Sequence, residues 1–562
     1  MNTLLSHFLR RVDHLEALGN HDGRCVVLRV PDIEEVETLG RDLGFNFTHE
    51  EASVLQPKFV NALRRLDRLS EMRIGEEHAL AHGDLNRRSW RLTKEQDPLN
   101  AFTWACRVEG APEGALSGKT VGLKDNIALA GVPLTMGSHF MDGYIPDFDA
   151  AVVTRLLAHG ATILGKLNLH DFASGGGLLG IGDFGRTPNP YDHERVSGGS
   201  SSGCAVAVAT GMVDLAIGDD QGGSIRNPAH YCGVVGVKPT YGLVPHTGAV
   251  GADPSLDHLG PLSRSVRDSA LTLQCIAGSD GDDPRQADCP PLTDLMTGLD
   301  GGVRGLRIGL LLEGIGYEGM EREVSDAVLG CLDVLAGAGA IVGKVSIPMH
   351  EEAYIPASAI MLGGTKRLYD TNLGGAFYGS SYPASLMTTF GRFKRSNGHE
   401  LPISYKQTVA LAEYLERYYH GRFYAKAQNM RRTVRQAYDS AFENFDVIVC
   451  PTKPTRAPKF VEPRNQREEL EFFLERGVSE AAFSRNTAPF NYTGHPAISV
   501  PCAMTDGLPI GIQLVGRHYE DGLLLRVAST IQEIVDLSRF ELPQVSTSPN
   551  ATSESSGKGH PS

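Results

Sequence analysis

The sequence lacks the features of secreted, zinc-stabilised and membrane-spanning proteins. Its nine cysteines form no Cys-x-x-Cys pair, and the one cysteine close to a histidine, Cys232 near His230, has no second pair beside it. This pattern predicts a reducing compartment and no structural metal. No apolar run reaches 18 residues, and the N-terminal stretch has only short apolar pairs before its charges, so we expect neither a membrane span nor a signal peptide. A cytoplasmic protein is the resulting expectation.

Basic residues are also in short supply. Lysine and arginine number 53 against 67 aspartate and glutamate, which gives a net charge of −14 at pH 7. Nucleic-acid-binding proteins normally display basic patches, so this balance argues against a nucleic-acid partner. Apolar residues make up 41% and charged residues 21%, the usage of an ordinary globular protein, which excludes a fibrous or disordered chain. Glycine is in excess, since 64 of 562 residues is about 11% against a usual ~7%.

The two ends of the chain differ from its middle. Residues 1–96 have few glycines and many charges, and a set of apolar residues there recurs at three- and four-residue spacing, which predicts a helical extension. The apolar face of such a helix must be buried somewhere, and a homodimer is our hypothesis. Residues 542–562 are too polar to offset the entropy of ordering and should be disordered. The apolar set in the extension is Phe59, Val60, Leu63, Leu66 and Leu69.

Residues 97–541 are expected to form one extended α/β domain. Short β-branched runs alternate there with helical patterns, which indicates a sheet covered by helices. Ser265 and Asp268 have the spacing of a capping box and predict the start of a helix. A long helix is expected over 405–445, with a break near Gly421. Segments with the alternating texture are 120–123, 151–160, 161–166, 214–218, 305–313, 325–340, 446–452, 497–502 and 510–516.

The excess glycines gather with serines in two stretches, 196–211 and 217–228. A glycine-rich loop that leads into a helix can direct backbone NH groups at an anion, which would suit phosphate. The Gly-Lys-Ser/Thr ending of a phosphate-binding loop is missing, however. A Gly-x-Gly-x-x-Gly match at 175–180 follows a polar, helix-like segment rather than a strand, so a dinucleotide site is disfavoured too.

The first stretch also matches the Gly-x-Ser-x-Gly nucleophile elbow of α/β-hydrolases over 199–203. That interpretation would make Ser201 the nucleophile. The preceding residues are a poor strand, and the elbow leaves the second glycine-serine stretch unexplained. It remains the main rival chemistry.

Both stretches together resemble the amidase signature family. In that family two Gly-Gly-Ser boxes carry serines 24 residues apart, as Ser200 and Ser224 do here, and a Lys-Asp-Asn turn supplies a lysine, matched by Lys124. The resemblance covers about 97–541. It implies a mixed central β-sheet covered by helices and a catalytic triad of these three residues. The boxes are filled by Gly198, Gly199, Ser200, Ser201, Ser202 and Gly203, and by Gly218, Asp220, Gly222, Gly223, Ser224, Arg226 and Pro228.

The resemblance implies a mechanism that physical chemistry supports. Burial disfavours the charged form of a lysine and can lower its pKa by several units, so a buried Lys124 could act as a base. Ser200 would pass its proton to Lys124 and take one from Ser224 as that hydroxyl attacks an amide carbonyl. The peptide bond between Gly199 and Ser200 should be cis. The oxyanion should be bound by the backbone NH groups of Gln221, Gly222, Gly223 and Ser224.

Other polar residues near the boxes are expected to have supporting roles. Asp220 and Arg226 flank the nucleophile and should form an ion pair that fixes its loop. Cys204 begins an apolar helix and should serve packing. Three histidines lack partners at metal-ligand spacing, and neither a metal nor a cofactor is expected; they are His170, His230 and His258.

The predicted function is hydrolysis of carboxamides, preferably primary amides, to acid and ammonia. The chain looks most like amidases of nitrile degradation in its second box, in residues 279–288 and in its helical extension. The alternative is the A subunit of a tRNA-dependent amidotransferase, which shares the triad but takes glutamine and passes ammonia to a partner. A non-catalytic binding protein is a further alternative, which the intact triad disfavours. Pocket segments 168–182 and 350–440 vary within the family, so the acyl group stays open.

Overall fold

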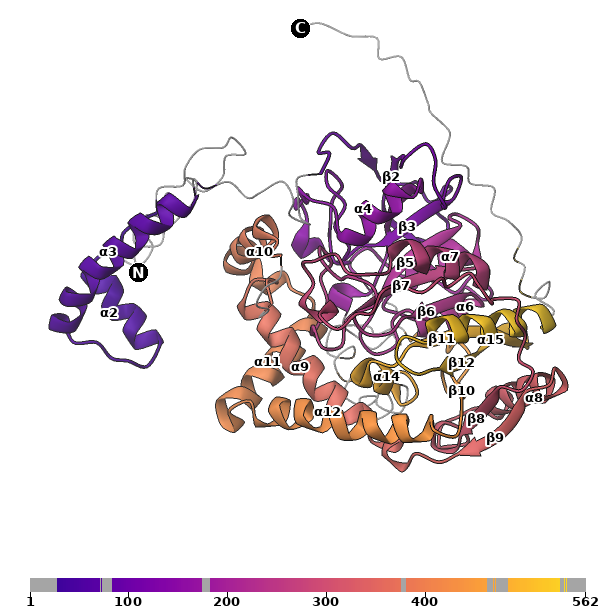
Figure 1. Ribbon diagram of the computed structural model, residues 1–562. Coiled ribbons are helices and arrows are strands. Elements are labelled where there is room, and N and C mark those ends of the chain that lie inside the picture. Colours follow the sequence, from indigo (N-terminus) through magenta and orange to yellow (C-terminus); the bar gives the residue numbers. More distant parts are fainter. Residues whose placement is uncertain are drawn as a thin grey trace, which may run out of the picture. The chain divides into compact units, whose positions relative to one another are not determined.

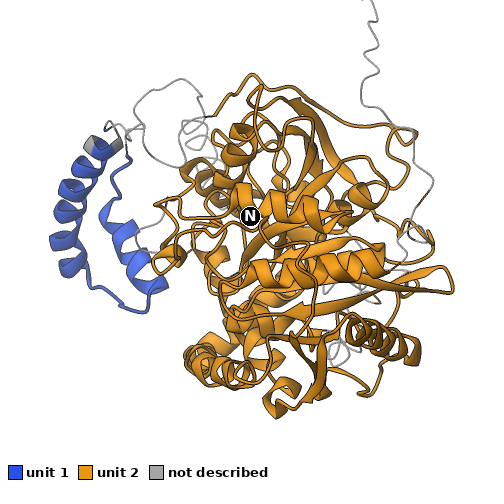
Figure 2. Ribbon diagram, turned by 45° about the vertical axis from the view of Figure 1, so that its right-hand side comes forward, with its two compact units in different colours: residues 1–78 blue, residues 79–562 orange. Residues whose placement is uncertain are grey.

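The structure is a computed structural model that describes residues 28–70, 72, 83–173, 182–375, 381–461, 468, 471, 484–535, 540 and 542. Two of the predictions, the disorder of the C-terminal tail and the weak dinucleotide match at 175–180, lie outside the described residues. The chain divides into two compact units, residues 1–78 and residues 79–562 (Figure 2).

The first unit contains two described helices, α2 (Ile33–Asp42) and α3 (His49–Ser70). Asp32 begins α2 with a capping box, because its side chain accepts from the Glu35 backbone NH and the Glu35 side chain accepts from the Asp32 NH. The apolar repeat predicted to be helical lies within α3. Within this unit, its Leu66 and Leu69 are 49% and 58% exposed.

The division between the units falls earlier than the expected boundary at residue 97. Residues 83–96 belong to the second unit because they bond to it. Arg87 forms an ion pair with Asp149, with a second contact at 2.8 Å, and β1 (Ser89–Trp90) pairs with β2 (Phe102–Val108). Because this segment pairs with the sheet and forms an ion pair with Asp149, it is part of the second unit.

The second unit is built on a mixed sheet of twelve strands in the order β1-β2-β4-β3-β5-β7-β6-β11-β12-β10-β8-β9 (Figure 1). The pairs β3–β4, β3–β5, β8–β9 and β8–β10 are parallel and the others antiparallel. The predicted α/β class and mixed sheet are confirmed. The remaining strands are β3 (Thr120–Lys124), β4 (Thr162–Leu167), β5 (Leu215–Asp220), β6 (Val235–Lys238), β7 (His258–Ser263), β8 (Arg307–Leu311), β9 (Ile341–Val345), β10 (Val447–Pro451), β11 (Ala497–Thr505) and β12 (Leu508–Val515).

Helices cover both faces of this sheet. On one face, α5 (Ser202–Ala209) and α6 (Arg226–Cys232) pack their small residues against the central strands. The opposite face carries four amphipathic helices over a large aliphatic core, and the first turn of one of them is capped by Ser265 as predicted. These four are α4 (Ala151–Ala158), α7 (Val266–Ile276), α8 (Arg322–Gly337) and α15 (Asp521–Ile534).

A further group of helices lies to one side of the sheet (Figure 1), and some of them pack against its strands. The predicted long helix is two helices, α11 (Ile403–Tyr419) and α12 (Arg422–Ala441). His420 and Gly421 both have positive φ, at 55° and 72°, which ends one helix and begins the next. The break predicted at Gly421 is therefore confirmed. The others in this group are α9 (Tyr354–Asp370), α10 (Ala384–Asn397) and the short α14 (Ala488–Thr493).

Parallel pairing in the middle of the sheet brings polar residues from two strands to the same edge. β3 and β5 are parallel neighbours, with Leu123 opposite Ile217, so both strands end at the same edge. Lys124 ends β3, and Asp219 and Asp220 end β5. Among the described helices, none combines the length and the apolar character needed to cross a bilayer.

The exposed side chains of Leu66 and Leu69 on α3 lead to a prediction about assembly. We expect the protein to form a homodimer through this unit, because exposed leucines on an amphipathic helix favour burial against an equivalent face. Light scattering should give a mass near twice the 60.6 kDa of the chain. A double variant, Leu66→Asp with Leu69→Asp, should be monomeric, whereas Lys58→Asp on the same helix should stay dimeric. A monodisperse wild-type monomer at micromolar concentration would contradict the hypothesis.

Candidate active site

Lys124 occupies the end of β3 with its side chain fully buried. Its Nζ donates to Ser200 Oγ at 2.8 Å and to the Asp219 carbonyl at 3.0 Å. The predicted contact between the lysine and the first-box serine is therefore present. An amine held this close to a hydroxyl can take its proton directly.

The surroundings of Lys124 favour its neutral form. Burial lowers the pKa of Lys124 from its ordinary value, while the thiol of Cys204 and three nearby carboxyl groups partly oppose that shift. These carboxyl groups belong to Asp219, Asp220 and Asp257. Because burial outweighs the attraction of the carboxylates, the amine is closer to neutrality than a surface lysine, as a base requires.

The first serine box is a tight loop between α5 and the end of β4. The Gly199–Ser200 peptide bond is cis, as predicted. A Cβ on Gly199 would lie 2.1 Å from the His170 ring, so only glycine fits there. The His170 NH donates to the Ser200 carbonyl at 3.2 Å, and the Ser201 NH donates to the Ser224 carbonyl at 3.3 Å. The second of these bonds ties the two boxes together.

Asp220 organises the loop that carries Ser224. Its buried carboxylate accepts from the backbone NH groups of Gly223, at 2.7 Å, and Ile225, at 3.0 Å. It also accepts from the Asn491 side chain at 2.9 Å. Burial alone would raise the pKa of this carboxyl, but the Arg226 guanidinium and these donors hold it well below its usual range. Asp220 is therefore an anion that fixes the path of the backbone on both sides of Ser224.

Arg226 is the partner of Asp220, and both side chains are fully buried. Its Nε and Nη2 donate to the two oxygens of Asp220 at 3.0 and 2.9 Å. Its remaining donors reach the Thr487 carbonyl at 3.0 Å and the side chains of Asn491 and Gln513 at 2.6 and 2.8 Å. The predicted ion pair is present. Its other contacts connect the loop to α14 and β12, more than 250 residues further along the chain.

One residue of the expected oxyanion site departs from the prediction. The Gly223 NH points at Asp220 and is used inside the protein. Among the described residues, no group accepts from the NH groups of Gln221, Gly222 or Ser224, so these three remain for a substrate oxygen. Gly223 has a different requirement: its φ of 131° and the contacts a Cβ would make, at 2.6 Å to Asn227 and Thr487, allow only glycine.

Asp219 faces the opposite side of β5 from Asp220, as alternation along a strand requires. Its carboxylate accepts from Asn126 Nδ2 at 2.6 Å and lies 3.2 Å from His246 Nε2, while its carbonyl accepts from Lys124. Burial would raise the pKa of Asp219, but His246 and Lys124 hold it below its usual value. Sequence reasoning assigned no role to Asp219 or His246. The only local signal was Asn126 itself, within the Lys-Asp-Asn turn.

A second buried lysine supports the same turn. Lys166 on β4 forms a fully buried ion pair with Asp125, at 2.8 Å, and Asp125 also accepts from Thr103 and Thr135. This pair holds the turn that follows Lys124. Lys166 has no motif of its own in the sequence, so spacing could not identify it.

The rival candidates have other roles in the structure. The buried Ser201 hydroxyl donates to the Asp219 carbonyl at 3.3 Å, which is incompatible with a free nucleophile. Burial raises the pKa of the Cys204 thiol to about 12, in keeping with packing. His230 lies between the carbonyls of Gly511 and Thr455, and His258 Nδ1 donates to Leu256. The nucleophile elbow is therefore not supported.

The chain is similar to known proteins over most of its length. The amidase family matches residues 91–525, and the chain therefore belongs to that family. The A chain of the glutamyl-tRNA(Gln) amidotransferase from Methanosarcina mazei is 38% identical over 438 residues, covering 77% of this chain and 88% of the relative. That name matches the alternative raised above, not an amidase of nitrile degradation. The family prediction is confirmed, and the protein is an enzyme that hydrolyses amide C–N bonds.

Solved structures agree on the fold. The corresponding glutamyl-tRNA(Gln) amidotransferase protein from Thermotoga maritima has a TM-score of 0.63 and 27% identity, covering 94% of this chain and 99% of its own. The peptide amidase of Stenotrophomonas maltophilia has a TM-score of 0.60 and 30% identity, covering 75% and 83%. The predicted amidase signature fold is thus confirmed.

Alanine variants of the three serines should separate their roles. We expect Ser224→Ala to lower kcat by about 10⁴-fold or more, and Ser200→Ala to lower it by orders of magnitude, because each interrupts the same proton path. Ser201→Ala is the matched control and should stay within about tenfold of the wild type. Steady-state amide hydrolysis and circular dichroism would measure activity and folding. Loss of activity in Ser201→Ala with Ser224→Ala still active would refute the assignment.

Asp219 should set the acid limb of the pH profile. Its charge raises the pKa of Lys124, so Asp219→Asn should lower that pKa. The base is neutral only above its pKa; activity therefore rises with pH through that value, and the variant's acid limb should shift to lower pH. The midpoint of kcat/KM against pH measures this, with the exposed Asp300→Asn as the control. An unshifted or raised midpoint would show that Asp219 does not act on Lys124.

Proposed function

We propose that the protein hydrolyses primary carboxamides to a carboxylic acid and ammonia through an acyl-enzyme on Ser224. The observation that carries this proposal is the buried Lys124, bonded to Ser200 Oγ at 2.8 Å, next to a second-box loop with three uncommitted NH groups. A base, a relay and an oxyanion site are the parts that acyl transfer needs.

The proposed steps use these groups. Ser200 passes its proton to neutral Lys124 and accepts the proton of Ser224, whose oxygen bonds to the amide carbon. The carbonyl oxygen becomes an oxyanion at the NH groups of Gln221, Gly222 and Ser224, where one such donor is typically worth about 2.7–4 kcal/mol. The C–N bond then breaks as the relay returns a proton to the nitrogen, and ammonia leaves. Water, deprotonated by the same relay, releases the acid.

The residues beside the relay favour an uncharged acyl group. Phe172 lies two positions after His170, whose NH donates to Ser200, and it contacts rings from the helical group. Its ring centroid is 4.6 Å from that of Tyr405 on α11 and 6.2 Å from that of Phe390 on α10. The two segments expected to build the acyl pocket thus meet in one apolar, aromatic cluster. These rings are buried, and an acyl pocket bordered by this apolar core would favour aliphatic or aromatic amides of small to medium size.

A second candidate function is glutamine hydrolysis within an amidotransferase. The name of the relative with 38% identity supports it, and the sequence comparison favours it over an amidase of nitrile degradation. The side-chain amide of glutamine is itself a primary carboxamide, so the triad would work in the same way. In favour of an independent amidase are the aromatic cluster and the first unit, which lies outside the matched residues 91–525.

Ammonia release distinguishes these functions. We expect the purified chain alone to release ammonia from acetamide, benzamide or oleamide. Activity should rise toward alkaline pH, because Lys124 must be neutral to act as a base even though burial lowers its pKa. Hydroxylamine should intercept the acyl-enzyme and give hydroxamates. A coupled ammonia assay between about pH 5 and 10 would measure both the substrate range and the pH limb.

The controls decide between the outcomes. Ser224→Ala must release no ammonia and form no hydroxamate. Turnover of glutamine alone, and only with partner proteins, would transfer the assignment to the amidotransferase. An optimum at the acid end would contradict a lysine base.

A further inference from the structure

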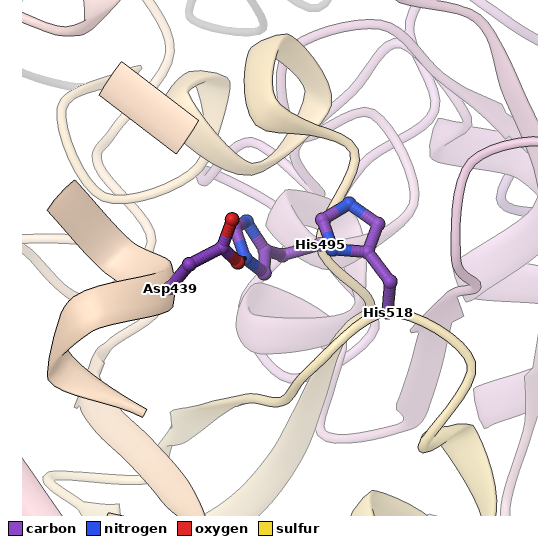
Figure 3. A group of neighbouring side chains, drawn as sticks. All are labelled: Asp439, His495 and His518. Atoms are coloured by element: carbon purple, nitrogen blue, oxygen red, sulfur yellow. Dashed lines mark hydrogen bonds and ion pairs between the residues drawn. The ribbon is translucent and has the colours of Figure 1, made fainter. Parts of the chain in front are cut away.

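A cluster of three potential metal ligands lies where the helical group meets the sheet, apart from the triad. It contains Asp439 on α12, His495 between α14 and β11, and His518 after β12 (Figure 3). One ligand atom from each lies within 4.8 Å of the others. His495 is fully buried and Asp439 is 51% exposed, so the cluster is open to solvent on one side.

The hydrogen bonds around Thr493 determine which nitrogen of His495 carries a proton. The single hydroxyl proton of Thr493 is donated to the Pro489 carbonyl at 2.9 Å, so its oxygen must accept from His495 Nδ1, at 2.8 Å. In neutral His495 the other nitrogen, Nε2, then carries no proton and presents a lone pair. It lies 3.0 Å from Asp439 Oδ1, which is also an acceptor. Two acceptors at this distance repel each other unless a proton or a metal ion lies between them.

Thr493 also fixes the second histidine. His518 Nε2 lies 3.1 Å from the Thr493 carbonyl and can only donate to it, which leaves Nδ1 as a lone pair. The two rings are close, with centroids 4.2 Å apart. Neutral imidazole whose second NH bonds to an oxygen is the form that binds metals.

We propose that Asp439, His495 and His518 bind a divalent transition-metal ion of the Zn²⁺ class. His495 Nε2, His518 Nδ1 and an Asp439 oxygen are the ligands, and Thr493 orients both rings through its hydroxyl and its carbonyl. Two imidazoles and a carboxylate suit Zn²⁺, Co²⁺ or Ni²⁺. Ligand distances of about 2.0–2.2 Å need ligand atoms roughly 3.3 Å apart. His495 Nε2 and Asp439 Oδ1, at 3.0 Å, already have nearly this separation, so any closing movement must bring His518 and this pair together.

Nearby positive charges oppose the ion only weakly. Arg435, one turn before Asp439, is exposed to solvent, which screens its charge. Lys238 Nζ donates to the backbone carbonyl of His495 at 2.7 Å, not to a ligand nitrogen. The bound ion would link α12, in the helical group that forms the aromatic cluster, to the segments beside β11 and β12. Its role is therefore structural, and none of its ligands belongs to the triad.

The test uses tag-free, full-length protein freed of metal by a chelator. Titration with ZnCl₂ in a calorimeter, and with CoCl₂ in a spectrometer, should show one equivalent per chain with the visible absorption of four-coordinate Co²⁺. Zn²⁺ should also raise the melting temperature. His518→Ala and Asp439→Asn should weaken binding at least tenfold, and Thr493→Val should weaken it about 10–100-fold through loss of ring orientation. The exposed His399→Ala is the matched control and should bind as the wild type does.

Two results would overturn the proposal. A wild type that takes up no Zn²⁺ would mean that the Thr493 hydroxyl turns its proton to His495 and that Asp439 accepts an ordinary hydrogen bond. Uptake unchanged in His518→Ala would place the ion elsewhere. Because chelation should leave amide hydrolysis in place well below the melting temperature, failure here is distinguishable from failure of the proposed function.

Discussion

The buried ion pair between Asp220 and Arg226 is the interaction on which the rest of the site depends. A carboxylate with no access to water must be compensated by several donors, and Asp220 obtains them from the backbone of the nucleophile loop and from Arg226. Arg226 in turn needs acceptors, which it finds on α14 and β12. Satisfying two buried charges thus gives the Ser224 loop one conformation. The same requirement binds distant parts of the chain to it.

The two buried lysines at this edge of the sheet have different neighbours, and their expected roles differ for that reason. Lys166 has a carboxylate partner at 2.8 Å and is held as an ion pair that supports the turn after β3. Within the described part of the chain, Lys124 has no carboxylate in contact; its Nζ bonds to a hydroxyl and a carbonyl. An amine without an anionic partner is neutralised by desolvation more readily than one with such a partner. The choice of neighbour, rather than the degree of burial, therefore separates a base from a structural cation.

Local patterns predicted much of this protein, and their limits are physical. The glycine-serine boxes and the lysine turn identified the residues that meet at the edge of the sheet, and Gly421 marked a real helix break, because each acts through its immediate neighbours in the chain. Gly223 was misjudged since an NH donor can be used by a carboxylate three residues away. His246 and Asn491 were invisible, because only folding brings them to Asp219 and Asp220. The proposed ligands Asp439, His495 and His518 are separated in the sequence, and only folding brings them together too.

The adjacency of Asp219 and Asp220 has a consequence for how this sequence can change. Consecutive side chains on a strand point to opposite faces, so one carboxylate is directed toward Asn126 and His246 and the other toward the nucleophile loop. Inserting or deleting a single residue between 215 and 219 would exchange the two faces if the pairing of β5 with β3 and β7 were kept. Each acid would then meet partners suited to the other. The length of this strand is thereby constrained, although half of its positions, Leu215, Ala216 and Ile217, are ordinary aliphatic core.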